Sequence, residues 1–226
     1  MRFLPLSLTA HPTAWGPGSA GTERQDPAKV ADAPCRFCGA FAAGRQEAFH
    51  LDGDHTNDRS DNVVPACTLC HLVQHPDVAA RQRSVRLVWL PEMSQAAVFM
   101  LARTAQLDLV DAKADPTLDE PPAKSSGVVD AAWSALSALR AREEQARSRL
   151  LTNDPNVLGA ALLALTPRAF RGRSNLLSGI RMLPTGRMLV DGKDIYPDLL
   201  RAWAGRPDPK LKPSPVSTSK PSRKAA

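Results

Sequence analysis

Four cysteines in two closely spaced pairs constrain this chain more than any other feature of its sequence. Two residues separate Cys35 from Cys38 and Cys67 from Cys70, and 28 residues lie between the pairs. Two such pairs can supply the four thiolate ligands that a tetrahedral zinc ion takes at about 2.3 Å. Disulfides are disfavoured in a reducing compartment, and an iron–sulfur cluster is less usual at this spacing. The spacing therefore predicts one structural Zn²⁺ with no open coordination position.

The residues between the pairs predict a ββα unit around this zinc ion. Asp52-Gly53 is a strong turn signal, and short strands are expected on both sides of it. The second cysteine pair is expected to begin a short helix. His71 and His75 are four residues apart, so both imidazoles can share one face of that helix.

Length and composition favour a folded α+β protein of one large domain or two small ones. The chain has 226 residues, of which 43% are hydrophobic and 5% aromatic, so its core must rest on Leu, Val and Ala. No stretch reaches the roughly 18 uninterrupted apolar residues of a transmembrane helix, and residues 1–10 lack the apolar part of a signal peptide. We therefore expect a cytoplasmic protein with reduced cysteines.

Turn-forming residues and changes in composition divide the chain into six segments. Prolines, aspartates and serines crowd into residues 111–127, which is typical of a linker or long loop. The expected segments are an N-terminal strand and irregular segment (1–34), the zinc module (35–80), a strand and helix (81–110), the linker (111–127), a helical part (128–205) and a disordered tail (206–226).

Hydrophobic periodicity predicts the elements outside the zinc module. Strands are expected over residues 2–8 and 84–90, and helices over 92–107, 128–151, 155–165 and 196–204. In the longest of these helices, apolar residues recur at helical spacing and favour core packing; they are Val129, Trp133, Leu136, Leu139 and Leu150.

The basic charge of the chain is concentrated at its C-terminal end. The formal net charge is +6, but residues 206–226 hold six basic residues against one acidic residue. Residues 35–80 hold three basic residues against six acidic ones, and zinc-bound thiolates add further negative charge. The Pro-, Ser- and Lys-rich tail has too little apolar surface to fold. We expect it to be disordered, with a basic arm for nucleic acid or anionic lipid as the alternative.

The zinc module resembles the HNH endonucleases, whose ββα unit carries a catalytic histidine, a later asparagine and a final histidine. In this chain His50, Asn62 and His71 match the three motif positions, and the resemblance covers roughly residues 35–76. For a nuclease, the resemblance implies that these three residues are catalytic, with His50 as the general base.

One departure from the HNH pattern argues against catalysis. In that class the residue before the catalytic histidine binds the catalytic metal together with the last histidine, and here it is Phe49, which cannot bind a cation. Phosphodiester hydrolysis of this kind needs a metal, and the acidic module repels DNA phosphates. We therefore expect no catalytic residues. A shifted metal site at Asp54, His55 and His71 is the open alternative; otherwise His50 and His71 hold the turn and helix by hydrogen bonds.

Phrases spread over residues 1–205 resemble the IcmJ/DotN proteins of type IVB (Dot/Icm) secretion systems. They are CRFCG and FHLDGDH in the zinc module, WLPEMSQ at 89–95, GIRMLP at 179–184 and GKDIYP at 192–197. The resemblance implies a cytoplasmic zinc protein with an HNH-like fold, peripherally associated with the inner membrane through its partners. It also implies docking on the C-terminal region of the coupling ATPase, beside other coupling-complex subunits.

The sequence thus predicts a non-catalytic, zinc-binding adaptor or scaffold subunit that helps to recruit or present effectors, and nucleic acid is not an expected partner. A metal-dependent HNH endonuclease that cleaves DNA is the second interpretation, and a nucleic-acid binder using the basic tail is the third. The apolar phrase at 89–93 is a candidate docking surface, because Trp and Met are enriched at interfaces. The plainer interpretation of this phrase is a core strand that runs into a helix.

Overall fold

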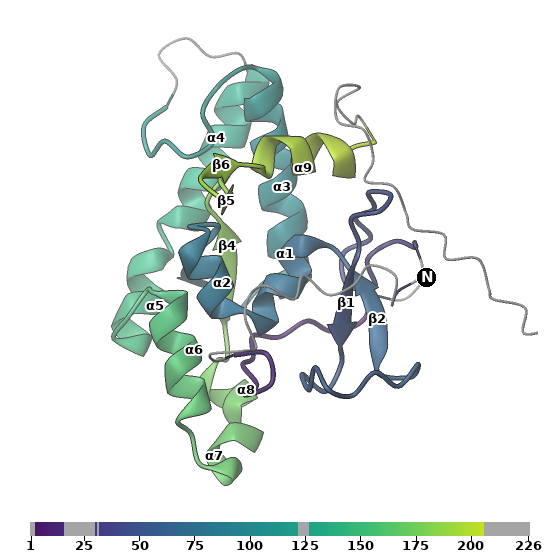
Figure 1. Ribbon diagram of the computed structural model, residues 1–226. Helices are drawn as coiled ribbons and strands as arrows, with labels where there is room; N and C mark the ends of the chain where they lie inside the picture. The colour runs from purple at the N-terminus through teal and green to yellow at the C-terminus, as the bar shows by residue number, and fades with distance from the viewer. Residues whose placement is uncertain (1–2, 16–29, 31, 122–126, 206–226) are drawn as a thin grey trace, which may run out of the picture.

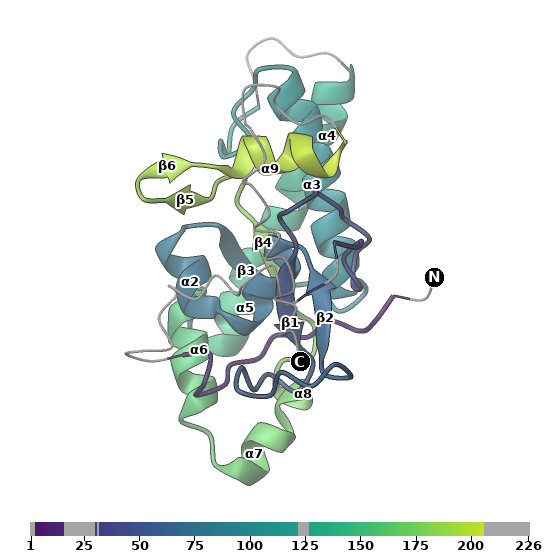
Figure 2. The ribbon, with the colours of Figure 1, turned by 45° about the vertical axis from the view of Figure 1, so that its right-hand side comes forward.

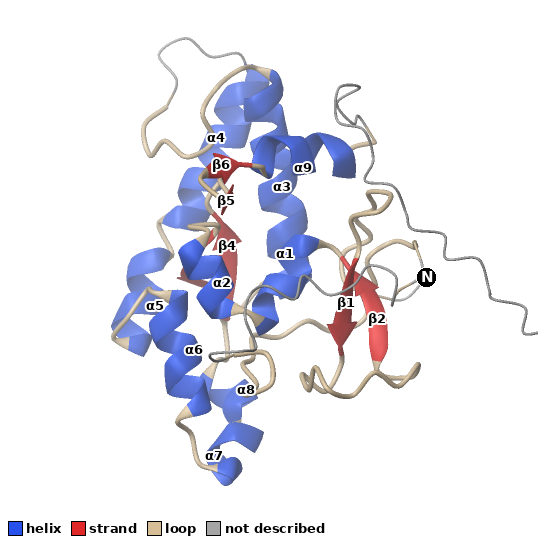
Figure 3. Ribbon diagram, in the orientation of Figure 1, coloured by secondary structure: helices blue, strands red, loops and turns tan. Residues whose placement is uncertain are grey.

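The computed structural model describes residues 3–15, 30, 32–121 and 127–205, and over these residues the fold is α+β (Figures 1 and 3). The strands form three antiparallel pairs: β1 (Glu47–His50) with β2 (Val63–Ala66), β3 (Val85–Trp89) with β4 (Ile180–Pro184), and β5 (Leu189–Val190) with β6 (Lys193–Asp194). The tail predicted over 206–226 lies outside the described residues.

Helices occupy most of the remaining described chain. After β2 come three short ones: α1 (Thr68–His71), the 3₁₀ turn η2 (Leu72–Gln74) and α2 (Pro76–Arg81). The others are α3 (Gln95–Asp111), α4 (Gly127–Arg140), α5 (Glu143–Leu150), α6 (Pro155–Leu163), α7 (Pro167–Arg171), α8 (Arg173–Leu176) and α9 (Tyr196–Trp203).

The β1–β2 hairpin followed by α1 reproduces the predicted order of two strands and a helix. Its register pairs Glu47 with Ala66 and His50 with Val63, so residues 51–62 form the loop at the end of the hairpin. Figure 1 shows the hairpin on one flank of the molecule and α5 and α6 on the opposite flank. In the turned view of Figure 2, the β5–β6 pair projects from the body as a short hairpin beside α9.

The main core joins this hairpin unit to the C-terminal part of the chain. Phe37, Phe49 and Leu69 belong to the same buried cluster as Leu158 of α6 and Tyr196 of α9. The unit that carries the cysteines is therefore packed against the rest of the described chain rather than standing apart from it.

Two buried glutamines of α3 hold β4 in place. The Gln95 side chain donates to the Met182 carbonyl and accepts from the Met182 N–H, both at 2.8 Å. Gln106 donates to the Pro184 carbonyl at 2.8 Å and accepts a 2.6 Å hydrogen bond from the Tyr196 hydroxyl. These bonds satisfy backbone groups of a buried strand that would otherwise lack partners.

The strand predicted over residues 2–8 is wrong for residues 3–8, which the structure describes without regular secondary structure. This segment is held at separate points instead of along a ladder. The Leu4 N–H donates to the Arg36 carbonyl at 2.9 Å, and the Thr9 N–H donates to the Val73 carbonyl at 3.0 Å.

The single helix predicted over 128–151 is also wrong, because a turn at residues 141–142 separates α4 from α5. The Arg142 carbonyl there accepts a 3.1 Å hydrogen bond from the N–H of Trp89, the last residue of β3. Trp89 itself is half-buried under the Arg149 guanidinium, 4.0 Å from the ring centroid. The first residue of the 89–93 phrase is therefore the last residue of a core strand.

Candidate metal centres

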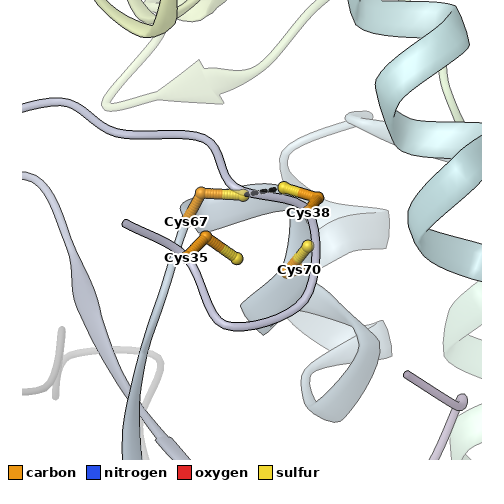
Figure 4. Close-up of side chains that lie close together, drawn as sticks. All are labelled: Cys35, Cys38, Cys67 and Cys70. Carbon is orange, nitrogen blue, oxygen red and sulfur yellow. Dashed lines mark hydrogen bonds between the residues drawn. The ribbon is translucent and has the colours of Figure 1, made fainter. Parts of the chain in front are cut away.

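The four cysteines come together in one buried group, which we call the cysteine site (Figure 4). Cys35 and Cys38 lie in the turn before β1, Cys67 follows β2, and Cys70 lies in α1. All four sulfurs lie within 4.8 Å of one another, and those of Cys38 and Cys67 are 3.6 Å apart. The predicted pairing of the two C-x2-C segments around one point is therefore confirmed.

Local backbone geometry explains how the first cysteine pair is presented. Gly39 has a φ of +72°, a conformation that favours glycine, and its N–H donates to the Cys35 carbonyl at 2.9 Å. The Cys35 N–H donates in turn to the Ala40 carbonyl at 2.9 Å. Arg36 ties this tight turn to β2, because its N–H donates to the Pro65 carbonyl at 2.9 Å.

The cysteine site fits a zinc ion in both distance and chemistry. A tetrahedral ion with bonds of about 2.3 Å places its sulfur ligands about 3.8 Å apart, close to the separation found here. Hydrogen bonds from Cys35, Cys67 and Cys70 lower the pKa of the Cys38 thiol, whereas burial raises the pKa of the Cys70 thiol. Buried thiolates at this spacing need a cation to hold them together, and a divalent ion meets that need.

A half-buried cation lies beside the cysteine site. The Arg103 guanidinium of α3 donates to the Cys38 sulfur at 3.6 Å, and its other neighbour is the Trp203 ring, 5.7 Å away. A zinc ion with four thiolates carries two negative charges, and this arginine offsets part of them. The spacing motif gives no hint of this residue, which comes from 65 positions further along the chain.

Of the residues expected to matter for a nuclease, Asn62 directs its side chain to residues of the loop between β1 and β2. Its side chain accepts from the Asp52 N–H at 3.1 Å and donates to the Asp52 carboxylate at 2.9 Å and the Asn57 carbonyl at 2.8 Å. Asn62 thus holds the loop between β1 and β2. Phe49 is buried, with its ring 4.5 Å from that of Phe37.

His50 and His71 each form a hydrogen bond with a carboxylate. His50 Nε2 lies 3.1 Å from Asp58 Oδ1, and His71 Nδ1 lies 2.6 Å from Glu47 Oε2. Both histidines are buried. These bonds agree with the interpretation in which the two residues hold the turn and the helix.

His55, His71 and His75 form a second group of mutually close ligand atoms, which we call the histidine cluster. One ring nitrogen from each lies within 4.8 Å of the others, and the Nε2 atoms of His71 and His75 are 3.0 Å apart. His50 stacks on His55 with ring centroids 4.8 Å apart.

The sequence indicates the His71–His75 spacing and a shifted site with Asp54, but not this set of three. The Asp54 carboxylate is exposed and accepts from the Thr56 N–H and hydroxyl, at 2.9 and 2.7 Å. Asp54 is not in the group of mutually close ligand atoms, in which His75 joins His55 and His71.

Comparison with known proteins gives one informative match. No family model matches the chain. The chain is 26% identical over 156 residues to the Type 4 apparatus protein DotN of Legionella pneumophila, a match that covers 67% of this chain and 66% of DotN. The chain therefore spans just under two thirds of the length of that relative. Within the ranges that the structure describes, no helix has both the length and the apolar character needed to cross a bilayer.

Proposed function

This chain falls in the IcmJ/DotN family, and from that premise we propose that it is a non-catalytic, zinc-binding adaptor or scaffold subunit of a type IVB secretion coupling-protein complex. The observation that carries the proposal is its similarity to a type 4 apparatus protein over two thirds of the chain. In this proposal it docks on the C-terminal region of the coupling ATPase and helps to recruit or present effectors. It is then a cytoplasmic protein that reaches the inner membrane through its partners.

The cysteine site supports a structural role for zinc in this adaptor. Its four ligands leave a tetrahedral ion no position for substrate or water. The ligands come from the turn before β1, the end of β2 and α1, so one ion connects every part of the ββα unit. An HNH-like unit pinned in this way provides a rigid platform for protein contacts without any chemistry of its own.

The residues that a nuclease would use support the same conclusion. Phe49 packs between the Phe37 and His71 rings, where it offers no ligand atom. Asn62 serves the loop, and residues 35–80 carry more acidic than basic side chains. A DNA-binding surface needs the opposite charge, because neutralised phosphates supply most of the affinity for DNA.

The test is affinity purification of the tagged full chain from its own cells at moderate salt, followed by mass spectrometry. We expect a membrane-associated ATPase in near-equal amount, and its loss when the C-terminal region of that ATPase is deleted. Cys67→Ser should lose the ATPase because the module unfolds, whereas the neighbouring Thr68→Ser, which keeps its hydroxyl, should retain it. Copurification of nucleic acid without an ATPase would contradict the proposal.

One observation favours the second candidate function, a metal-dependent endonuclease: His50 stacks directly on the histidine cluster. Plasmid DNA incubated with the zinc-loaded chain and Mg²⁺, Mn²⁺ or Ni²⁺ distinguishes the two functions. The adaptor proposal expects intact plasmid. Cleavage that His50→Ala abolishes and His11→Ala leaves unchanged would establish the nuclease.

A further inference from the structure

We propose that His55, His71 and His75 form a second metal site, separate from the cysteine site and suited to a divalent transition metal such as Zn²⁺. The three histidines come from different segments: the loop after β1, α1, and the residue that precedes α2. A shared ion would therefore fasten this loop to both helices. Neutral imidazole is a ligand that suits zinc, copper, nickel and iron.

The distances within the histidine cluster are close to those of a bound ion. Metal–nitrogen bonds of about 2.0–2.1 Å in a tetrahedron place the ligand nitrogens about 3.3 Å apart. His71 and His75 are already at 3.0 Å, and the three ligand atoms span at most 4.8 Å. His55 is half-buried and lies on a loop, so a small movement of that loop would complete the geometry. Three ligands leave a fourth position for water or another ligand.

His71 and His75 face each other with the two nitrogens that a shared ion would use. The Glu47 carboxylate has no proton to give when ionised, so His71 Nδ1 at 2.6 Å must be the donor. In a neutral His71 ring this leaves Nε2 as the ligand atom, and it faces His75 Nε2. The two Nε2 atoms are 3.0 Å apart, a distance that either a hydrogen bond between the rings or a shared metal ion accounts for.

Glu47 completes the arrangement as a positioning residue for His71. A carboxylate that accepts from the second ring nitrogen of a metal-binding histidine fixes its tautomer and orientation. Glu47 is itself held from the other side, because its second carboxylate oxygen accepts from the Thr68 hydroxyl at 2.7 Å. Replacing such a partner in other metal sites weakens metal binding by about 10–100-fold.

The experiment titrates Co²⁺ into the full chain already loaded with one equivalent of zinc, and follows visible absorption and metal content. We expect one further equivalent to bind, with cobalt d–d bands but without thiolate-to-cobalt charge-transfer bands, while zinc is retained. His55→Asn, at the half-buried loop position, should abolish this signal, and Glu47→Gln should weaken binding about 10–100-fold. Arg187→Gln, at a half-exposed arginine on the protein surface, is the control and should bind cobalt like the unmodified chain.

Melting curves of the chain loaded with one equivalent of zinc, without a chelator, keep the test independent of folding. His55→Asn should melt like the unmodified chain under these conditions, and only the unmodified chain should gain stability when a second equivalent of Co²⁺ or Zn²⁺ is added. Absence of a second equivalent, or charge-transfer bands with release of zinc, would overturn the proposal and leave a proton shared between two imidazoles. No partner protein is needed, so failure here would leave the adaptor proposal standing.

Discussion

The cysteine site and the histidine cluster lie in the same short stretch, residues 35–75, yet they are built for different purposes. The first has four ligands, all buried, which belong to the framework of the ββα unit. The second has three ligands, of which His55 is half-buried on a loop. Four thiolates at one site and three imidazoles at the other suit different purposes: a closed ion would fold the module, while a more open one would adjust the loop.

The largest difference between the two is expected from loss of a ligand at the cysteine site. Metal binding by zinc-finger peptides is worth about 10–16 kcal/mol, which matches or exceeds the whole stability of a typical domain at about 5–15 kcal/mol. Cys67→Ser should therefore release zinc and unfold the module, whereas His75→Gln should leave the cysteine-bound zinc in place. Zinc analysis and circular dichroism melting check this; equal melting curves for Cys67→Ser and the unmodified chain would contradict it.

A smaller effect is expected at the arginine that faces the cysteine site. Arg103→Met removes the guanidinium at 3.6 Å from Cys38 while keeping much of its apolar stem. Hydrogen bonds to charged groups contribute about 1.5–3 kcal/mol, so we expect a loss in that range and faster zinc release by a thiol reagent. Arg187→Met, at a half-exposed arginine on the protein surface, is the control. Identical rates of zinc release for the two variants would show that Arg103 does not stabilise the cysteine site.

The smallest effect is expected in the loop that carries His55. Asn62→Ala breaks three hydrogen bonds to Asp52 and Asn57 but touches neither group of metal ligands. Because these partners are partly solvated, the expected cost in unfolding free energy is about 1 kcal/mol. Denaturant unfolding measures that cost. Cobalt affinity at the histidine cluster should fall while zinc is retained at the cysteine site. Loss of zinc with unchanged cobalt affinity would contradict separate roles for the two sites.

Sequence spacing was sufficient to predict the cysteine site because its ligands lie in two local C-x2-C turns. The strands around Asp52-Gly53 and the helix at Cys67 follow from equally local signals. The histidine cluster could not be predicted in full, since His55 lies in an irregular loop whose path depends on tertiary contacts. One of these is the hydrogen bond from the His55 N–H to Thr13, 42 residues away.

Long-range pairing also explains which elements were predicted wrongly or left undefined. β4 was not predicted within the part expected to be helical, residues 128–205, because its partner β3 and the glutamines of α3 lie far away in sequence. The helical pattern of 128–151 continues through Arg142, but the backbone carbonyl of that residue accepts a hydrogen bond from the Trp89 N–H. Hydrophobic periodicity detects a helical face and carries no information about such a bond.

X-ray absorption at the zinc edge tests the two-site arrangement most directly. The full chain with one equivalent of zinc should show only sulfur neighbours, at about 2.3 Å. A second equivalent should add nitrogen neighbours at about 2.0–2.1 Å without loss of the sulfur shell. Nitrogen neighbours at the first equivalent, or no sulfur shell at all, would contradict a module built on the four cysteines.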